Sequence, residues 1–299
     1  MSLTIEEAIA RVPQWANEKD LKISPLTGGI TNENFRVEVK GDVFVLRIPG
    51  ADTELLGIDR AVECAVSQMA GEAGIGPKVF YVIEPEGYLV TSFIEGQLPP
   101  PEELGKKENI YRVAKAVSRF HEMDAIPETF SPFRVVETSA EIARGFKVEF
   151  PDNFGWLIEQ MKVAEDALQK NPFTPKLCHN DLLNANFLDD GEIRILDWEY
   201  AGMGDPVFDL ANFSVHHEFN DEQDHWLLEA YFGEVSDADW ARLKILKIIS
   251  DFREAMWAMV QIGISKLDFD FRDYANTYFA RTEKGIKSDN WEKWLRNSL

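Results

Sequence analysis

The sequence predicts an α+β fold with two lobes, and three observations support this. Residues 20–95 carry one pair of strand-like stretches before a helical stretch and a second pair after it. The run Leu98-Pro99-Pro100-Pro101 then interrupts the pattern, and helical periodicity dominates the rest of the chain. We therefore expect a small antiparallel β-sheet lobe with one helix over residues 1–96, and a larger, mostly helical lobe over residues 97–299.

The strand pairs of the N-terminal lobe follow from alternation and turn residues. Phe35, Val37 and Val39 alternate with charged residues, which is typical of a strand with one buried face. Gly41-Asp42 forms the turn to an apolar return strand over 43–48. The predicted order is hairpin, helix, hairpin, with the helix over 59–71 and the second hairpin formed by 79–83 and 88–93.

The C-terminal lobe is predicted from helical spacing. Apolar side chains recur at this spacing over 102–123, and Thr138-Ser139-Ala140-Glu141 fits a capping box that would open another helix. Short apolar strands are expected only within 177–197. Further helices are predicted over 154–168, 221–232, 237–263 and 271–281.

Charge and composition exclude several classes of partner. The formal net charge is −21, and residues 181–240 hold sixteen Asp or Glu and a single basic residue, Arg194. Such a surface does not favour a nucleic-acid backbone, whose binding needs Lys and Arg. The acidity serves solubility, or it attracts a cationic small substrate. The chain lacks an apolar run of about 18 residues, so no membrane insertion is expected.

The expected location is cytoplasmic. Met1 to Trp15 lacks a basic segment followed by an apolar core, so it is not a secretory signal. The two cysteines, Cys64 and Cys178, are expected to be reduced thiols, and neither has the spacing of a zinc ligand.

The residues that follow Cys178 predict a phosphoryl-transfer site. Asp181 and Asn186 are five residues apart, which is the interval between the catalytic Asp and the Asn of a kinase loop. Asp197 follows eleven residues later, after an apolar stretch, where kinases carry a metal-binding carboxylate. Mg²⁺ prefers such oxygen ligands. His179 is expected to pack and hold this loop.

Other residues fit the same chemistry. Arg47 ends an apolar strand and Glu63 lies in the next helix, so an ion pair of the kind that fixes nucleotide phosphates is expected. The polar, glycine-containing run Thr27 to Asn34 would let backbone N–H groups approach phosphates. Asp205 and Asp209 are expected to cap a helix and to tie down the catalytic loop.

These motifs resemble the choline/ethanolamine kinase family, within the wider aminoglycoside-phosphotransferase-like kinases. The resemblance runs over roughly residues 20–285. It lies in Gly28 to Phe35, Val45-Leu46-Arg47-Ile48, Gly76-Pro77-Lys78, Ser92 to Gly96, His179-Asn180-Asp181 with Asn186, Asp197 to Tyr200, Trp257 to Gln261 and Phe269 to Ala275.

The resemblance implies a two-lobed protein-kinase-like fold, ATP at the hinge and phosphate transfer to a primary alcohol on an amine. The resemblance also implies that Asp181 is the catalytic base and that Asn186 and Asp197 bind Mg²⁺. Glu254 stands where choline kinases often have Trp, which would favour a primary ammonium or a larger polar cation. The implied ATP-binding residues are Gly29, Thr31, Asn32, Asn34, Arg47, Glu63, Ser92 and Ile94, and the implied acceptor-binding residues are Tyr200, Trp257, Tyr274 and Glu254.

The sequence therefore predicts an ATP- and Mg²⁺-dependent kinase acting on a small cationic amino alcohol, with choline or ethanolamine first. The alternatives are a related kinase for an aminoglycoside or thiamine, and a non-catalytic nucleotide-binding protein on the same fold. Proteins of the last kind typically lack the base or a metal ligand, whereas all three residues are present here.

Overall fold

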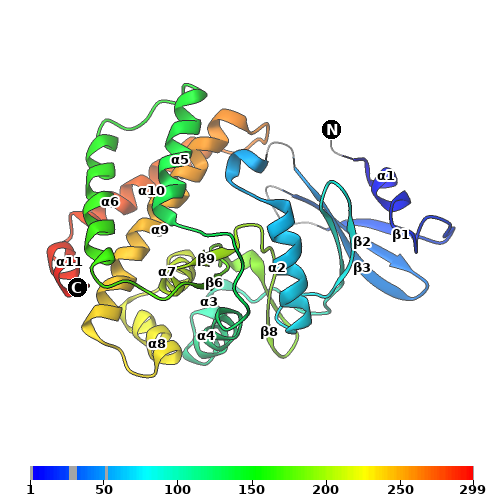
Figure 1. The fold of residues 1–299 in the computed structure, drawn as a ribbon, viewed down its shortest axis with the longest axis horizontal. Helices are drawn as coiled ribbons and strands as arrows, with labels where there is room; N and C mark the ends of the chain where they lie inside the picture. Colours follow the sequence, from blue (N-terminus) through cyan, green and yellow to red (C-terminus); the bar gives the residue numbers. More distant parts are fainter. Residues whose placement is uncertain (1–2, 27–31, 51–52, 299) are drawn as a thin grey trace. The chain divides into compact units, whose positions relative to one another are not determined.

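The computed structural model describes residues 3–26, 32–50 and 53–298. The chain divides into two compact units (Figure 1), Met1–Pro100 with Asn184–Ala201, and Pro101–Leu183 with Gly202–Leu299. An antiparallel sheet with few helices makes up most of the first unit and helices make up most of the second, which confirms the predicted fold class. The division of the sequence at residue 96 stays a prediction, and in the structure 184–201 groups with the N-terminal residues.

The first unit is built on a five-stranded antiparallel sheet with strand order β1-β2-β3-β5-β4. Both predicted hairpins are confirmed, and Phe35 pairs with Leu46 in the first of them. Alternation along the strands buries Val37, Leu46 and Val90 in one core with Trp15. The main elements are α1 (Ile5–Ala10), β1 (Lys22–Leu26), β2 (Asn32–Val39), β3 (Asp42–Pro49), α2 (Arg60–Glu72), β4 (Val79–Ile83) and β5 (Tyr88–Ser92).

The segment 184–201, which belongs to this unit, contains a short hairpin. It consists of β7 (Phe187–Asp189) and β8 (Ile193–Ile195), which are antiparallel. The Ile195 N–H donates to the Ile75 carbonyl at 2.9 Å, and the Gln97 N–H donates to the Asp189 carbonyl at 3.0 Å. These backbone bonds fix the hairpin against the N-terminal part of the chain.

The second unit is a helical assembly around the long helix α9 (Asp237–Ile264), drawn in gold in Figure 1. Helices α5, α7, α10 and α11 pack against α9. The elements are α3 (Pro101–Leu104), α4 (Lys107–His121), α5 (Pro132–Gly145), α6 (Phe154–Gln169), β6 (Lys176–Cys178), β9 (Gly202–Gly204), α7 (Pro206–His216), α8 (Asp221–Phe232), α10 (Phe271–Ile286) and α11 (Trp291–Asn297).

Two sequence-based boundaries were wrong. The expected capping box at Thr138 lies inside α5, because Ser131 caps that helix by accepting from the Arg134 N–H and Pro132 occupies its first turn. The expected helix over 102–123 is two helices, α3 and α4, with a break after Leu104. Across the described part of the chain, no helix combines the length and apolar character that crossing a membrane requires.

Candidate active site

A pocket of about 370 Å³ lies within the first unit. Its walls are mostly apolar side chains from the sheet, from the segment after β5 and from the β7–β8 hairpin, with a few polar groups among them, a mixture typical of small-molecule sites. Six of the sequence-predicted residues line it: Asn34, Arg47, Ser92, Ile94, Asn186 and Asp197.

The β7–β8 hairpin brings the two predicted metal ligands together. Asn186 immediately precedes β7 and Asp197 follows β8 after one residue, so antiparallel pairing puts both at the same end of the hairpin. The Leu196 N–H donates to the Asn186 carbonyl at 2.9 Å, which closes that end. Asp197 has a φ of 68°, in the left-handed region that Asp and Asn tolerate better than most residues.

Arg47 forms the ion pair that the sequence predicted. Its Nη1 lies 2.5 Å from Glu63 Oε1 and its Nη2 lies 2.9 Å from Asp197 Oδ1. Burial opposes the charge of Arg47, but the carboxylates of Asp197, Glu63 and Glu199 outweigh burial and raise its pKa. The predicted ion pair between Arg47 and Glu63 is thus confirmed, while the contact of Arg47 with phosphates stays a prediction.

Glu199 is a candidate site residue that sequence reasoning did not select. Its carboxylate accepts from Asn32 Nδ2 at 3.1 Å and lies 3.3 Å from Arg60 Nη1. Burial and the nearby Asp197 carboxylate raise the pKa of Glu199 to about 7. Carboxylate oxygens of Glu63, Asp197 and Glu199 lie within 4.8 Å of one another. Asn32 thus contacts Glu199, whereas the predicted loop residues Gly29 and Thr31 lie outside the described residues.

In the second unit, Asp209 of α7 holds the segment that carries Asp181. One oxygen of Asp209 accepts from the His179 N–H at 2.8 Å and the other accepts from the Asn180 N–H at 2.6 Å. The Leu182 N–H donates to Asn212 Oδ1 at 2.6 Å, also on α7. These bonds fix the backbone on both sides of Asp181. The predicted structural roles of Asp205, which caps α7, and of Asp209 are confirmed.

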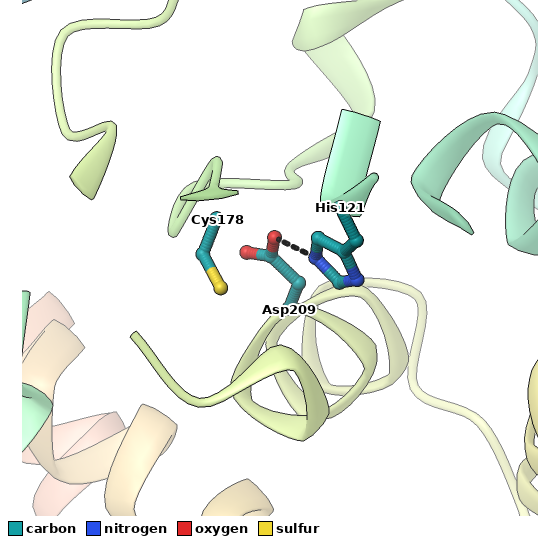
Figure 2. Close-up of side chains that lie close together, drawn as sticks. All are labelled: His121, Cys178 and Asp209. Carbon is teal, nitrogen blue, oxygen red and sulfur yellow. Dashed lines mark hydrogen bonds and ion pairs between the residues drawn. The ribbon is translucent and has the colours of Figure 1, made fainter. Parts of the chain in front are cut away.

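Figure 2 shows His121 of α4 beside Asp209 and Cys178. His121 Nε2 donates to Asp209 Oδ2 at 3.0 Å, and His121 Nδ1 lies 2.7 Å from the Tyr231 hydroxyl. Burial raises the pKa of the Cys178 thiol, and the neighbouring Asp209 carboxylate adds to this. A metal would need the thiolate and the donors that Asp209 and His121 already use, so we assign this cluster to packing and loop support.

Asp181 lies beside a group of charged side chains on α9. Its Oδ1 is 3.2 Å from Arg253 Nη1, and the same nitrogen is 2.7 Å from Glu254 Oε1. Burial raises the pKa of Asp181, and Arg253 opposes that shift. Glu254 also accepts from the Tyr274 hydroxyl at 3.1 Å, and His216 Nε2 lies 3.7 Å from it.

The predicted acceptor-binding aromatics are divided between the units. Trp257 on α9 and Tyr274 on α10 are neighbours, with ring centroids 5.8 Å apart, and Tyr278 lies 4.6 Å beyond Tyr274. Tyr200 belongs to the first unit. Its position beside Trp257 stays a prediction, as does the meeting of Asp181 with Asn186 and Asp197.

Arg253 and His216 were also missed by sequence reasoning. A signal for Arg253 exists, because Arg253-Glu254 lies in the middle of a long, mostly buried helix, and charged residues are rarely buried without partners. His216 carries no such signal, since its place at the end of α7 becomes informative only when α9 lies beside it.

Comparison with known proteins gives concordant results. The choline/ethanolamine kinase family model matches residues 23–228. Human ethanolamine kinase 1 is 26% identical over 315 residues, covering 89% of this chain and 68% of that protein. The protein LicA of Haemophilus influenzae is 26% identical over 263 residues, covering 83% of this chain and 75% of that protein.

Solved structures of choline/ethanolamine kinases are also similar to this chain. A choline/ethanolamine kinase family protein from Mesorhizobium loti superposes with a TM-score of 0.85 at 32% identity, covering 98% of this chain and 97% of that one. Choline kinase LicA from Streptococcus pneumoniae has a TM-score of 0.79 at 23% identity, covering 94% and 97%, and shows the same fold. On the family match and these structures, the chain belongs to the choline/ethanolamine kinase family of phosphotransferases, with a two-lobed protein-kinase-like fold.

Proposed function

We propose that the protein transfers the γ-phosphate of ATP to the hydroxyl of a small cationic amino alcohol, choline or ethanolamine, with Mg²⁺. The observation that carries the proposal is the β7–β8 hairpin, at whose end Asn186 and Asp197 line a pocket together with Arg47. Membership of the choline/ethanolamine kinase family supports the same reaction class.

The nucleotide would occupy the pocket of the first unit. Ser92 at the end of β5 and Ile94 just after it would lie along the adenine base. Arg47 would contact the phosphates while Glu63 holds its guanidinium. Gly29 and Thr31 would belong to the phosphate loop, whereas Asn32 and Asn34, which were expected in the same loop, form the start of β2 and would contribute from there.

The metal ligands would be the Asn186 amide oxygen and the Asp197 carboxylate, the hard oxygen donors that Mg²⁺ prefers. The donor set fits a divalent cation, because carboxylate oxygens of Glu63, Asp197 and Glu199 lie within 4.8 Å of one another and a cation would relieve their repulsion. Burial and, after it, the Asp197 carboxylate raise the pKa of Glu199. When bound, Mg²⁺ offsets negative charge on the phosphate oxygens.

Asp181 would act on the acceptor. Its carboxylate accepts a hydrogen bond from the hydroxyl, aligns the oxygen on the γ-phosphorus and takes the proton as the new O–P bond forms and ADP leaves. The backbone bonds to Asp209 and Asn212 keep the segment in place before the acceptor arrives, so positioning supplies much of the acceleration.

The cationic end of the acceptor would face aromatic rings. Trp257 and Tyr274 are neighbouring rings, with centroids 5.8 Å apart, and Tyr200 is the third aromatic assigned to this site. An ammonium group is attracted to such faces by the ring quadrupole. The acidic composition of 181–240 would add a long-range attraction for cations.

The test is an assay of ADP release with a panel of choline, ethanolamine, an aminoglycoside and thiamine. We expect turnover with choline or ethanolamine that disappears when Mg²⁺ is chelated. Turnover confined to the aminoglycoside or to thiamine would instead assign the related kinase activity. Binding of nucleotide with no ADP formed from any acceptor would indicate a non-catalytic protein.

The variant Asp181→Asn assigns the base. We expect kcat to fall by roughly a hundredfold or more, within the usual contribution of a general base, while the thermal midpoint of unfolding stays close to that of the parent. Near-normal turnover by a folded Asp181→Asn protein would remove Asp181 from the mechanism.

A further inference from the structure

The guanidinium of Arg253 lies between the partly buried carboxylate of Asp181 and the buried carboxylate of Glu254, both in the second unit. Its Nη1 is 3.2 Å from Asp181 Oδ1 and 2.7 Å from Glu254 Oε1, and the Arg253 side chain is only 3% exposed. A charge removed from water in this way persists when opposite charges and hydrogen bonds compensate it. The three side chains therefore form one electrostatic unit, which we call the Asp181–Arg253–Glu254 triad.

We propose that Arg253 is a positioning residue for Asp181, and that Glu254 anchors Arg253 rather than binding the ammonium group of the acceptor. This inference rests on the proposed function, because it takes Asp181 as the group that meets the acceptor hydroxyl. It changes the assignment of Glu254, which the family resemblance placed in the acceptor site.

The first argument concerns the ionisation of Asp181. Burial raises the pKa of Asp181, and the neighbouring Glu254 carboxylate adds to this shift. Arg253 lowers that pKa most, and the imidazoles of His216 on α7 and His179 in the same segment as Asp181 lower it further. Without Arg253 the carboxyl would hold its proton to higher pH, and a protonated carboxyl does not accept the proton of the hydroxyl.

The second argument concerns the partners of Glu254. One oxygen contacts Arg253 and lies 3.7 Å from His216 Nε2, and the other accepts from the Tyr274 hydroxyl at 3.1 Å. Despite burial, Arg253, His216 and Tyr274 lower the pKa of Glu254 to about 2. Both oxygens are thus engaged by protein groups, and an incoming ammonium would have to displace one of them.

The experiment compares variants on two acceptors that differ only in charge. One acceptor is the amino alcohol that the parent protein phosphorylates, and the other is its neutral isostere, in which carbon replaces nitrogen. The variants are Arg253→Met, Arg253→Lys, Glu254→Gln and the double variant Arg253→Met with Glu254→Gln, which avoids leaving Glu254 as an unpaired charge. Arg134→Met is the matched control, because Arg134 is half exposed and pairs with Glu137 and Glu165 on the helical surface.

For Arg253→Met we expect kcat to fall roughly tenfold or more on both acceptors, with the acid limb of the kcat/KM profile moved to higher pH. Arg253→Lys should recover part of the loss, since it keeps a charge but not the planar fork. Glu254→Gln should lower kcat by the same factor on both acceptors and leave their KM values nearly unchanged. Arg134→Met should behave as the parent.

Two results would overturn the proposal. An increase in KM that Glu254→Gln causes only on the charged acceptor would make Glu254 an ammonium ligand. An unchanged kcat and acid limb in Arg253→Met would remove Arg253 from the positioning of Asp181.

A readout without turnover separates this inference from the proposed function. Infrared titration of isotopically labelled aspartates, assigned with Asp181→Asn, should show a higher pKa for Asp181 in Arg253→Met than in the parent. An unchanged pKa of Asp181 would defeat the positioning role even if the panel found no acceptor, and failure of the whole panel would count against the proposed function alone. Thermal unfolding of each variant confirms that the folded protein is compared.

Discussion

At the residue scale, Asp209 shows how one buried side chain determines the local backbone of a candidate site. It is fully buried, and its two oxygens accept from two consecutive backbone N–H groups and from His121. A carboxylate has two oxygens and can accept all three of these hydrogen bonds. An amide has only one oxygen, so its NH₂ group would face at least one of the N–H donors.

Asp209→Asn should therefore lower the free energy of unfolding by roughly 3–5 kcal/mol, as expected when one partner of a buried charged network is removed. Urea denaturation at equilibrium measures this. The control is Asp166→Asn on the exposed side of α6, for which a change within about 0.5 kcal/mol is expected. Equal stability losses in both variants would show that the network contributes little.

Glu199 leads to a second prediction at this scale. Its pKa is raised to about 7, so the folded protein keeps a proton that the unfolded chain has lost between about pH 4.5 and 7. Its contribution to stability is therefore complete below the unfolded pKa and is lost as the pH rises through the folded pKa.

In Glu199→Gln this loss is absent. Without divalent cations, we expect the variant to gain stability relative to the parent on going from about pH 5 to about pH 8, by up to roughly 3 kcal/mol at about 1.4 kcal/mol per pKa unit. Urea midpoints at both pH values measure the difference. Parallel pH dependences of parent and variant would show that Glu199 ionises normally in the folded protein.

At the element scale, the packing of α10 on α9 depends on a glycine. A Cβ on Gly285 of α10 would lie 2.6 Å from Ile248 Cγ1 and 2.8 Å from its Cδ1, on α9. Alanine is intrinsically the better helix former by about 1 kcal/mol, but overlap with a packed side chain costs more.

Gly285→Ala should therefore destabilise the protein by roughly 1–3 kcal/mol. Gly155→Ala in α6 is the opposite case, because nothing lies within 4 Å of its Cβ, and it should gain up to about 1 kcal/mol. Thermal unfolding of both variants tests the pair. A stabilising Gly285→Ala would mean that α9 and α10 can move apart at little cost.

Prediction of elements from sequence succeeded where periodicity was long and boundaries were chemically marked. The helix expected over 221–232 has these bounds in the structure, because Asn220 and Gln223 form a capping box and Gly233 follows its end. The helix expected at Thr138 failed because a plausible cap inside a helix looks the same in sequence as a real one. The helix begins seven residues earlier, where Ser131 is the N-cap and Pro132 occupies the first turn.

The candidate site was predictable to a similar depth. Spacing selected Asp181, Asn186 and Asp197, whose roles stay predictions, and strand-to-helix order predicted the ion pair of Arg47 and Glu63 that the structure contains. Contacts between distant segments were not predictable, so Arg253 beside Asp181 and Glu199 beside Asn32 came only from the fold. Such partners lie 72 and 167 residues apart in the chain.

At the scale of the whole molecule, the charge of −21 opposes compaction. Raising NaCl from about 20 mM to about 200 mM shortens the screening length from more than 20 Å to less than 10 Å, so repulsion among surface carboxylates should weaken. We expect the thermal midpoint to rise with salt near pH 8.

The control is the same titration at low pH. Close to the isoelectric point of about 4.6 the net charge vanishes, and the salt effect should disappear or reverse. Calorimetry at both pH values tests this, and a salt-independent midpoint near pH 8 would show that local ion pairs already balance the excess.

The left-handed backbone of Asp197 has a consequence for how this position is mutated. In a saturation library, asparagine and glycine would keep the backbone relaxed, whereas alanine or a branched residue would add a conformational penalty of about 1–2 kcal/mol. Cellular abundance would then drop together with turnover, and an alanine scan would overstate the chemical importance of the carboxylate. Asparagine is the replacement that isolates the loss of charge.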